Sequence, residues 1–172
     1  MKLYLRPWKH TDLDSLVKYA DNYNIARFLT DQFPHPYTRQ DGEKFLALAM
    51  LDQPVRFFAI EVNGEVVGSI GVFPQTDIHA RNAEMGYWLA EPFWGQGIMT
   101  QAIREMVKYG FETFNISRIY ARPFGSNLAS QKILQKAGFT LEAKFPGILY
   151  KNGEYEDELV FAIRSENNTI SK

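Results

Sequence analysis

A segment with two closely spaced glycines, residues 91–100, offers the most specific chemistry in the sequence. It reads Glu-Pro-Phe-Trp-Gly-Gln-Gly-Ile-Met-Thr, and the apolar spacing that follows predicts a helix over 98–114. Gly95 and Gly97 allow the backbone to turn tightly and to approach another group closely. The first four N–H groups of a helix lack intrahelical partners, so together with the helix dipole they suit phosphate oxygens. Thr100 could add a hydroxyl.

Two common phosphate-binding motifs do not fit this segment. A P-loop needs Gly-Lys-Ser/Thr, and residues 91–100 contain no lysine. A dinucleotide fingerprint needs a third glycine where Thr100 stands, and an acidic residue about 20 positions later at the end of a second strand. The segment therefore predicts either a pyrophosphate site that uses no lysine and no metal, or a plain strand-to-helix turn whose glycines serve geometry alone.

Composition narrows the classes of function. The chain has 172 residues, 19 Lys and Arg against 20 Asp and Glu, and a net charge of −1, so it has no positive field for nucleic acid. The absence of cysteine excludes disulfides, thiolate metal sites and cysteine nucleophiles. His10, His35 and His79 are not at metal-ligand spacing. No apolar run is long enough for a signal peptide or a membrane span, so we expect a cytoplasmic protein without membrane, nucleic-acid or metal partners.

The apolar and turn patterns predict one mixed-sheet α/β domain over residues 1–164, followed by a polar tail over 165–172. Strands are expected at 2–6, 56–62, 65–73, 83–89, 118–122, 139–145, 147–151 and 155–163. Helices are expected from Thr11, over 25–29, after a Thr38/Asp41 capping pair, over 98–114, and over 128–137. The pairs Asn63-Gly64 and Asn152-Gly153 predict hairpin turns, and Gly138 a helix C-cap.

Four motifs stand in order along the chain: residues 83–89 (Ala-Glu-Met-Gly-Tyr-Trp-Leu), 94–100 (Trp-Gly-Gln-Gly-Ile-Met-Thr), 127–130 (Asn-Leu-Ala-Ser) and 136–139 (Lys-Ala-Gly-Phe). With the N-terminal Leu5-Arg6-Pro7 and the order of elements, they resemble the GNAT superfamily of N-acetyltransferases over nearly the whole chain. Each motif is weak alone, but four at the right separations are specific. The most similar branch contains the ribosomal-protein N-terminal (alanine/serine) acetyltransferases and the spermidine acetyltransferases.

The resemblance implies an α+β fold with a mixed, mostly antiparallel central sheet flanked by helices, in which a splayed strand pair forms the acyl-CoA cleft. In the family the glycine loop binds the pyrophosphate of acetyl-CoA through backbone amides, and the preceding strand pairs with the pantetheine arm. The residues thereby assigned to acetyl-CoA are Trp88, Leu89, Ala90, Trp94, Gly95, Gln96, Gly97, Ile98, Met99, Thr100, Asn127 and Ser130. Pro92 replaces the basic or Gln residue of other members, as is common in this branch.

The implied reaction is direct attack of an amine on the thioester carbonyl. An amine is mostly protonated at pH 7, so a base has to accept a proton. Glu84 is the candidate base because it matches the glutamate that often opens this strand in the family; the alternative is an ion pair with Arg81 or another cation. Asn127 is expected to cap a helix and also to contact the reacting region, and Ser130 to contact the CoA sulfur. For both, the alternative is an ordinary helix residue.

The expected activity is acetyl-CoA-dependent N-acetylation of a primary amine, with a protein N-terminal α-amino group as the favoured acceptor. The alternatives are acetylation of a small molecule (a polyamine or an aminoglycoside) and a non-catalytic acyl-CoA-binding module. Many members of the family carry a general-acid tyrosine where this chain has Leu134. In this chain Ser130 or water would therefore protonate the CoA thiolate, or the thiolate would leave without an acid. The acidic residues of 154–158 could meet a polyamine but are expected to be solvated, and His35 could line the acceptor groove. Neither the acceptor nor the choice between monomer and homodimer follows from the sequence.

Overall fold

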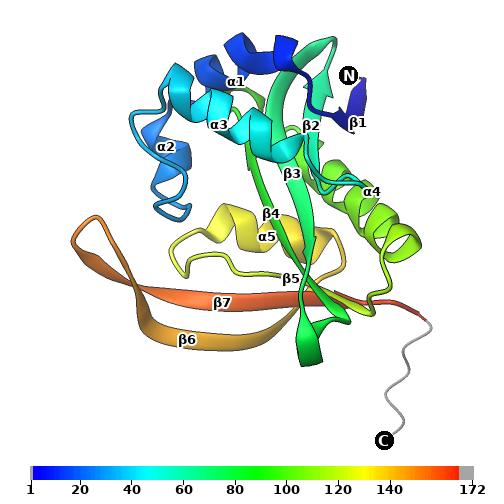
Figure 1. The fold of residues 1–172 in the computed structure, drawn as a ribbon. Helices are drawn as coiled ribbons and strands as arrows, with labels where there is room; N and C mark the ends of the chain where they lie inside the picture. The colour runs from blue at the N-terminus through cyan, green and yellow to red at the C-terminus, as the bar shows by residue number, and fades with distance from the viewer. Residues whose placement is uncertain (1, 167–172) are drawn as a thin grey trace, which may run out of the picture. The chain divides into compact units, whose positions relative to one another are not determined.

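The computed structural model describes residues 2–166, whose strands form a seven-stranded mixed sheet (Figure 1). The strand order is β1-β2-β3-β4-β5-β7-β6. The strands are β1 Leu3–Pro7, β2 Phe57–Val62, β3 Glu65–Pro74, β4 Asn82–Leu89, β5 Arg118–Ala121, β6 Thr140–Lys151 and β7 Glu154–Arg164. The β4–β5 pair is parallel, whereas β1–β2, β2–β3, β5–β7 and β6–β7 are antiparallel. The predicted α+β fold with a mixed, mostly antiparallel sheet is confirmed.

The helices follow the predicted order with small shifts at their ends. They are α1 Leu13–Ala20, α2 Tyr23–Ala26, α3 Arg39–Ala49, α4 Ile98–Thr113 and α5 Leu128–Lys136, with 3-10 turns η1 His10–Asp12, η2 Asp77–His79 and η3 Glu91–Phe93. The capping box of Thr38 and Asp41 and the left-handed C-cap Gly138 (φ +99°) are confirmed. The predicted start at Thr11 falls inside η1, because the Asp12 carboxylate accepts the Lys9 N–H at 2.8 Å and closes that turn first.

Both predicted Asn-Gly hairpin turns are present, but the C-terminal strands differ from expectation. Asn63 (φ +51°) and Gly64 (φ +88°) join β2 to β3 with the positive φ angles that this two-residue turn requires. The predicted break between 145 and 147 is wrong: β6 continues through it, and the irregularity appears as a register shift against β7 between Phe145 and Leu149. Residues 167–172 of the predicted tail lie outside the described residues. No helix in the described range is both long and apolar enough to cross a membrane.

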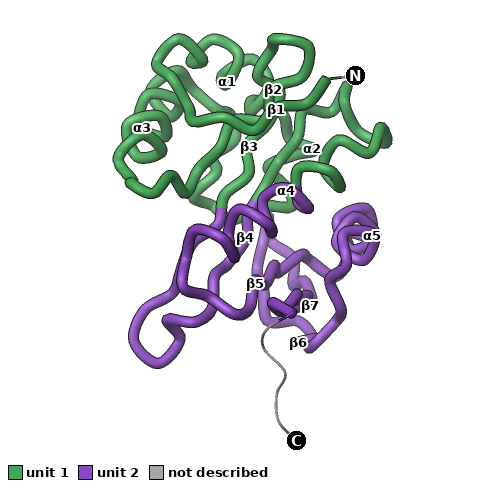
Figure 2. Tube along the Cα trace, turned by 90° about the vertical axis from the view of Figure 1, so that its right-hand side faces the viewer, with its two compact units in different colours: residues 1–71, 87–102 green, residues 72–86, 103–172 purple. Residues whose placement is uncertain are grey.

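The chain divides into two compact units, coloured separately in Figure 2. Unit 1 comprises Met1–Gly71 and Tyr87–Ala102, and its core is an apolar cluster around Leu16, Leu46 and Trp88. Unit 2 comprises Val72–Gly86 and Ile103–Lys172. Its buried side chains include Ile103, Met106, Ile119, Leu134 and Phe161. The division falls within β3 and β4, so the candidate site residues of β4 belong to different units.

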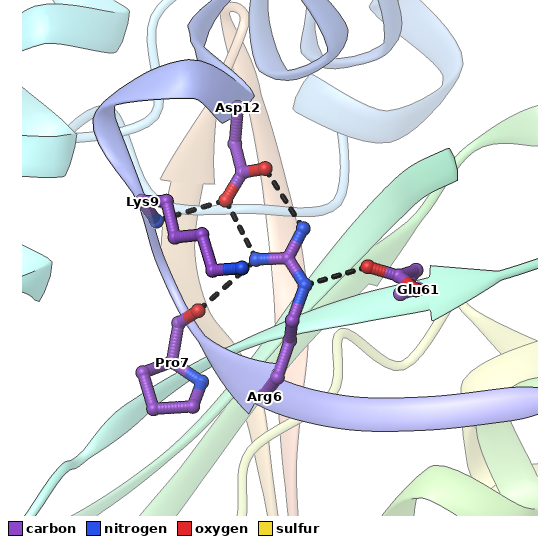
Figure 3. Close-up of polar contacts among 5 residues, drawn as sticks. All are labelled: Arg6, Pro7, Lys9, Asp12 and Glu61. Atoms are coloured by element: carbon purple, nitrogen blue, oxygen red, sulfur yellow. Dashed lines mark hydrogen bonds and ion pairs between the residues drawn. The ribbon is translucent and has the colours of Figure 1, made fainter. Parts of the chain in front are cut away.

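A cluster of ion pairs connects β1, the first strand of unit 1, to neighbouring elements (Figure 3). The Arg6 guanidinium donates to both Asp12 carboxylate oxygens at 2.8 Å, and its Nε donates to Glu61 at 2.6 Å. Asp12 is only 6% exposed. Burial acts to raise the pKa of Asp12, but hydrogen bonds from Arg6 and from the Lys9 N–H outweigh it and hold that pKa below its usual value. The cluster ties β1 to η1 and to β2.

Candidate active site

The glycine loop in unit 1 joins β4, through η3, to the long helix α4. Gly95 (φ +73°) and Gly97 (φ +78°) adopt the left-handed conformation that other residues rarely take. A Cβ added at either glycine would meet no protein atom within 4 Å. The two glycines therefore serve the turn itself, and the space beside them is open to a ligand rather than filled by the protein.

The start of α4 presents backbone donors beside this open space. The first helical hydrogen bond runs from the Gln101 N–H to the Gly97 carbonyl at 3.1 Å. The N–H groups of residues 98–100 therefore precede the first intrahelical donor of the helix. They stand at the positive end of a 16-residue helix, which favours anionic oxygens without a lysine or a metal. This arrangement fits the pyrophosphate of acetyl-CoA.

Side chains of the loop hold it in shape. The Trp94 indole N–H donates to the Leu89 carbonyl at 2.7 Å, and the Gln96 side-chain amide donates to the Pro92 carbonyl at 2.9 Å. The Ala90 N–H donates to Val67 of β3 at 2.8 Å. Trp94 and Gln96 were expected to contact acetyl-CoA, and that contact stays a prediction. Their hydrogen bonds give both residues a role in fixing the loop.

Sequence reasoning missed Glu91, which anchors η3 just before the loop. Its carboxylate accepts hydrogen bonds from the side-chain amides of Asn22 at 2.8 Å and Asn24 at 3.2 Å. These hydrogen bonds lower the pKa of Glu91. In the same turn, the Phe93 ring packs edge-to-face on Tyr19 at 6.0 Å between centroids. Asn22, Asn24 and Tyr19 thus hold η3, the turn that leads into the glycine loop, in place.

A second missed residue is Gly68 of β3. A Cβ there would lie 2.5 Å from the Trp88 carbonyl oxygen and 3.2 Å from the Leu89 Cα, so only glycine permits this approach of β4. The Trp88 side chain is 8% exposed and packs on Phe33 at 5.9 Å between centroids. An isolated glycine inside a predicted strand is a sequence signal for such close approach, and it was available here.

β4 and β5, between which a splay is predicted, share a short parallel ladder. The parallel pairing comprises Asn82↔Arg118, Ala83↔Ile119 and Glu84↔Tyr120, and β5 ends one residue later at Ala121. β4 itself continues to Leu89. The ladder therefore includes Glu84 as its last described pair; the splay and the acyl-CoA cleft stay predictions.

Glu84 is engaged in an ion pair within unit 2. Its two carboxylate oxygens accept from Nε and Nη2 of Arg122 at 2.8 and 3.0 Å. The hydrogen bond with Glu84 raises the pKa of Arg122, which also lies 3.9 Å from Glu158. The predicted alternative was an ion pair with Arg81 or another cation; the partner is Arg122, and the Arg81 side chain bonds Asn115 instead. Glu84 thus forms the ion pair that was the alternative to a catalytic role, and its role as base stays a prediction.

Asn127 and Ser130 are brought into contact at the start of α5. The Asn127 side-chain oxygen accepts the Ser130 N–H at 3.1 Å, so the predicted N-cap is confirmed. Leu134 is fully buried, as expected of a core residue. Contacts of Asn127 and Ser130 with acetyl-CoA or with the reacting atoms stay predictions.

The fold and the open helix start define an acyl-CoA-dependent acetyltransferase. Residues 2–140 match the family described as Acetyltransferase (GNAT) domain, and the chain belongs to that family. As a member, it is an N-acetyltransferase that uses acetyl-CoA as donor. In the part of the chain that the structure describes, no group of three or more His, Asp or Glu could hold a metal ion.

Several relatives resemble the chain along most of its length. Probable N-acetyltransferase YjcK of Bacillus subtilis is 36% identical over 168 residues, which cover 94% of this chain and 93% of that protein. Spermidine N(1)-acetyltransferase of Escherichia coli is 27% identical over 92% of this chain and 84% of that protein. The match to the uncharacterized N-acetyltransferase YoaA of B. subtilis, 36% identical, spans 58% of this chain and 55% of that relative.

Among solved structures, RimL, a ribosomal L7/L12 alpha-N-protein acetyltransferase in complex with coenzyme A, has a TM-score of 0.84. It is 25% identical to this chain and the match covers 98% of this chain and 97% of RimL. The presence of coenzyme A in that structure agrees with the open, donor-rich loop found here.

Proposed function

We propose that this chain transfers the acetyl group of acetyl-CoA to the N-terminal α-amino group of a protein. The donor half of the reaction follows from the family; the proposal concerns the acceptor. The relatives by themselves do not choose it, because one acetylates a ribosomal-protein α-amine and another acetylates spermidine, at similar identity. The choice rests on the acidic residues of the β6–β7 hairpin.

A polyamine is a chain of cationic amines, so a site for it needs carboxylates that are free to pair with them. Three of the four acidic side chains of 154–158 already have partners within unit 2. Glu156 accepts from the Ser126 hydroxyl at 2.7 Å. Asp157 accepts from the Gly147 N–H at 2.9 Å and lies 3.4 Å from Lys144.

Glu158 completes this pattern. Its side chain is 13% exposed and lies 3.9 Å from Arg122. Of the four acidic residues of 154–158, Glu154 alone has no such hydrogen bond or ion pair among the described residues. The acidic run therefore stabilises the hairpin, which disfavours a polyamine and leaves the single α-amine of a protein chain as the better acceptor.

The residues assigned to acetyl-CoA keep the roles that the sequence predicts. Gly95 and Gly97 would hold the pyrophosphate through the loop and α4 backbone, and Trp88, Leu89 and Ala90 would flank the pantetheine arm. Asn127 and Ser130 would contact the thioester region. The other predicted acetyl-CoA contacts are Trp94, Gln96, Ile98, Met99 and Thr100.

The test is the release of CoA thiol from acetyl-CoA with three acceptors: short peptides with free N-termini, the same peptides with blocked N-termini, and spermidine. Because the chain has no cysteine, the enzyme adds no thiol background. We expect release with the free peptides alone. Release with spermidine alone would replace the proposed acceptor by a polyamine, and equal release with blocked and free peptides would exclude the α-amine as the reacting group.

A further inference from the structure

Unit 1 contains an Asp–His pair that the reaction described so far does not use. Nδ1 of His35 lies 3.5 Å from Oδ1 of Asp21. The same carboxylate oxygen accepts the Tyr37 N–H at 2.9 Å, which fixes the carboxylate against the backbone. A neutral imidazole whose Nδ1 faces a carboxylate carries its free lone pair on Nε2, on the opposite side of the ring. In this orientation Nε2 is the ring nitrogen that faces away from Asp21.

The His35 imidazole packs against a neighbouring ring and is still exposed to solvent. The Tyr23 ring packs beside it at 5.8 Å between centroids, with a 60° angle between the planes. The His35 side chain remains 37% exposed. A small basic molecule such as an amine can therefore reach the ring from solvent.

Two sets of contacts connect this pair to the acetyl-CoA elements of the same unit. Phe33, two residues before His35, packs on Trp88 near the end of β4. Asn22 and Asn24, on either side of Tyr23, hold Glu91 in the turn before the glycine loop. The segments that carry Asp21 and His35 are thus both fastened to the strand and the loop that serve the donor.

The reaction needs a proton acceptor, because the attacking amine is mostly protonated at neutral pH. The sequence assigned this role to Glu84, but both oxygens of that carboxylate hold Arg122. To accept the amine proton, Glu84 would have to share or give up its two hydrogen bonds with Arg122.

We propose that His35 accepts the proton of the acceptor amine and that Asp21 is its positioning residue. The proposal rests on the proposed function for its acceptor. One proton passes from the ammonium to Nε2 of His35, and Asp21 stabilises the imidazolium. The neutral amine then attacks the thioester carbonyl: the C–N bond forms, the C–S bond breaks, and the second amine proton leaves with CoA as the free thiol. The imidazolium returns its proton to solvent.

The experiment compares His35→Ala and Asp21→Asn with wild type, using whichever of peptide or spermidine the wild-type protein acetylates. General-base catalysis predicts a fall in kcat of about 100-fold for His35→Ala, and the orienting role predicts about tenfold for Asp21→Asn. Imidazole added to the buffer should restore a large part of the His35→Ala rate above the enzyme-free background. His79→Ala, which removes an exposed histidine of η2, is the matched control and should behave as wild type.

The outcomes separate the two proposals. A lost kcat that imidazole restores, with unchanged affinity for acetyl-CoA by calorimetry, supports the role of His35. A change below about threefold overturns it, because a general base contributes far more. A raised KM that imidazole does not lower also overturns it, in favour of acceptor binding. Acetylation of spermidine alone contradicts the proposed acceptor but still decides the role of His35; transfer to neither amine contradicts both.

Discussion

Helices α4 and α5 both follow a strand, but they satisfy their first backbone donors in opposite ways. At α5 the side chain of Asn127 accepts the Ser130 N–H, so the helix start is closed by its own chain. At α4 two left-handed glycines precede the helix, and no atom approaches the position of their missing Cβ atoms. A closed start stabilises the fold, whereas an open start keeps its donors for a ligand. The difference supports the prediction that α4 binds the anionic part of acetyl-CoA.

The largest effect is expected from a substitution that places a side chain in the open space before α4. Gly97→Val puts a branched side chain at φ +78° and into the space beside the loop. We expect the affinity for acetyl-CoA, measured by calorimetry, to fall about 100-fold, equivalent to about 2.8 kcal/mol.

The matched control is Gly64→Val in the β2–β3 turn, where φ is +88° and the surroundings are equally open. Both variants should lose about 1–2 kcal/mol of stability from the left-handed backbone. Only Gly97→Val should lose affinity. Equal affinity in the two variants would show that the open start of α4 is not the binding site.

At a third helix start, that of η1, the hydrogen-bond acceptor is a charged carboxylate. The Asp12 carboxylate accepts the Lys9 N–H at the start of η1 and also holds Arg6. Asp12→Asn should lower the free energy of unfolding by about 2 kcal/mol, since it leaves Arg6 paired with Glu61 alone in a largely buried place. Affinity for acetyl-CoA should not change.

The pH dependence of stability checks the sign of this contribution. The folded-state pKa of Asp12 lies below its unfolded value, so the stabilisation is complete above the unfolded pKa and is lost as the pH falls through the folded one. Wild type and Asp12→Asn should therefore differ most near neutral pH and converge in acid, in unfolding curves recorded at several pH values. A gap that widens in acid would contradict the assignment.

The starts of α4 and α5 and the β2–β3 turn show what the sequence can predict. The open loop, the cap at Asn127 and the Asn63-Gly64 turn depend on the backbone preferences of adjacent residues, and each was predicted in place. The contacts of Glu84 with Arg122, of Glu91 with Asn22, and of Gly68 with Trp88 were missed. The partners of the first two pairs lie 38 and 69 residues apart in sequence, and only the folded chain brings them together.

The same reasoning explains why the site for acetyl-CoA is easier to predict from sequence than the site for the acceptor amine. Phosphate binding uses backbone donors, whose placement is set by glycines and a helix start. The proposed proton transfer from the amine depends on two single side chains, Asp21 and His35, which have no fixed spacing in sequence and acquire a role from their neighbours. Leu134 illustrates the limit: its burial shows that it packs, but no local pattern names a replacement for the family's tyrosine.

The smallest expected effect separates the two roles assigned to Asn127. Asn127→Ala removes the acceptor of the Ser130 N–H and should cost about 1 kcal/mol of stability. Asn127→Ser keeps a side-chain oxygen for the cap, so its thermal unfolding should match wild type within a few tenths of a kcal/mol. If the amide also contacts the reacting region, Asn127→Ser should still lose acetyl transfer in the CoA-release assay. Full activity in this stable variant would make Asn127 a cap alone.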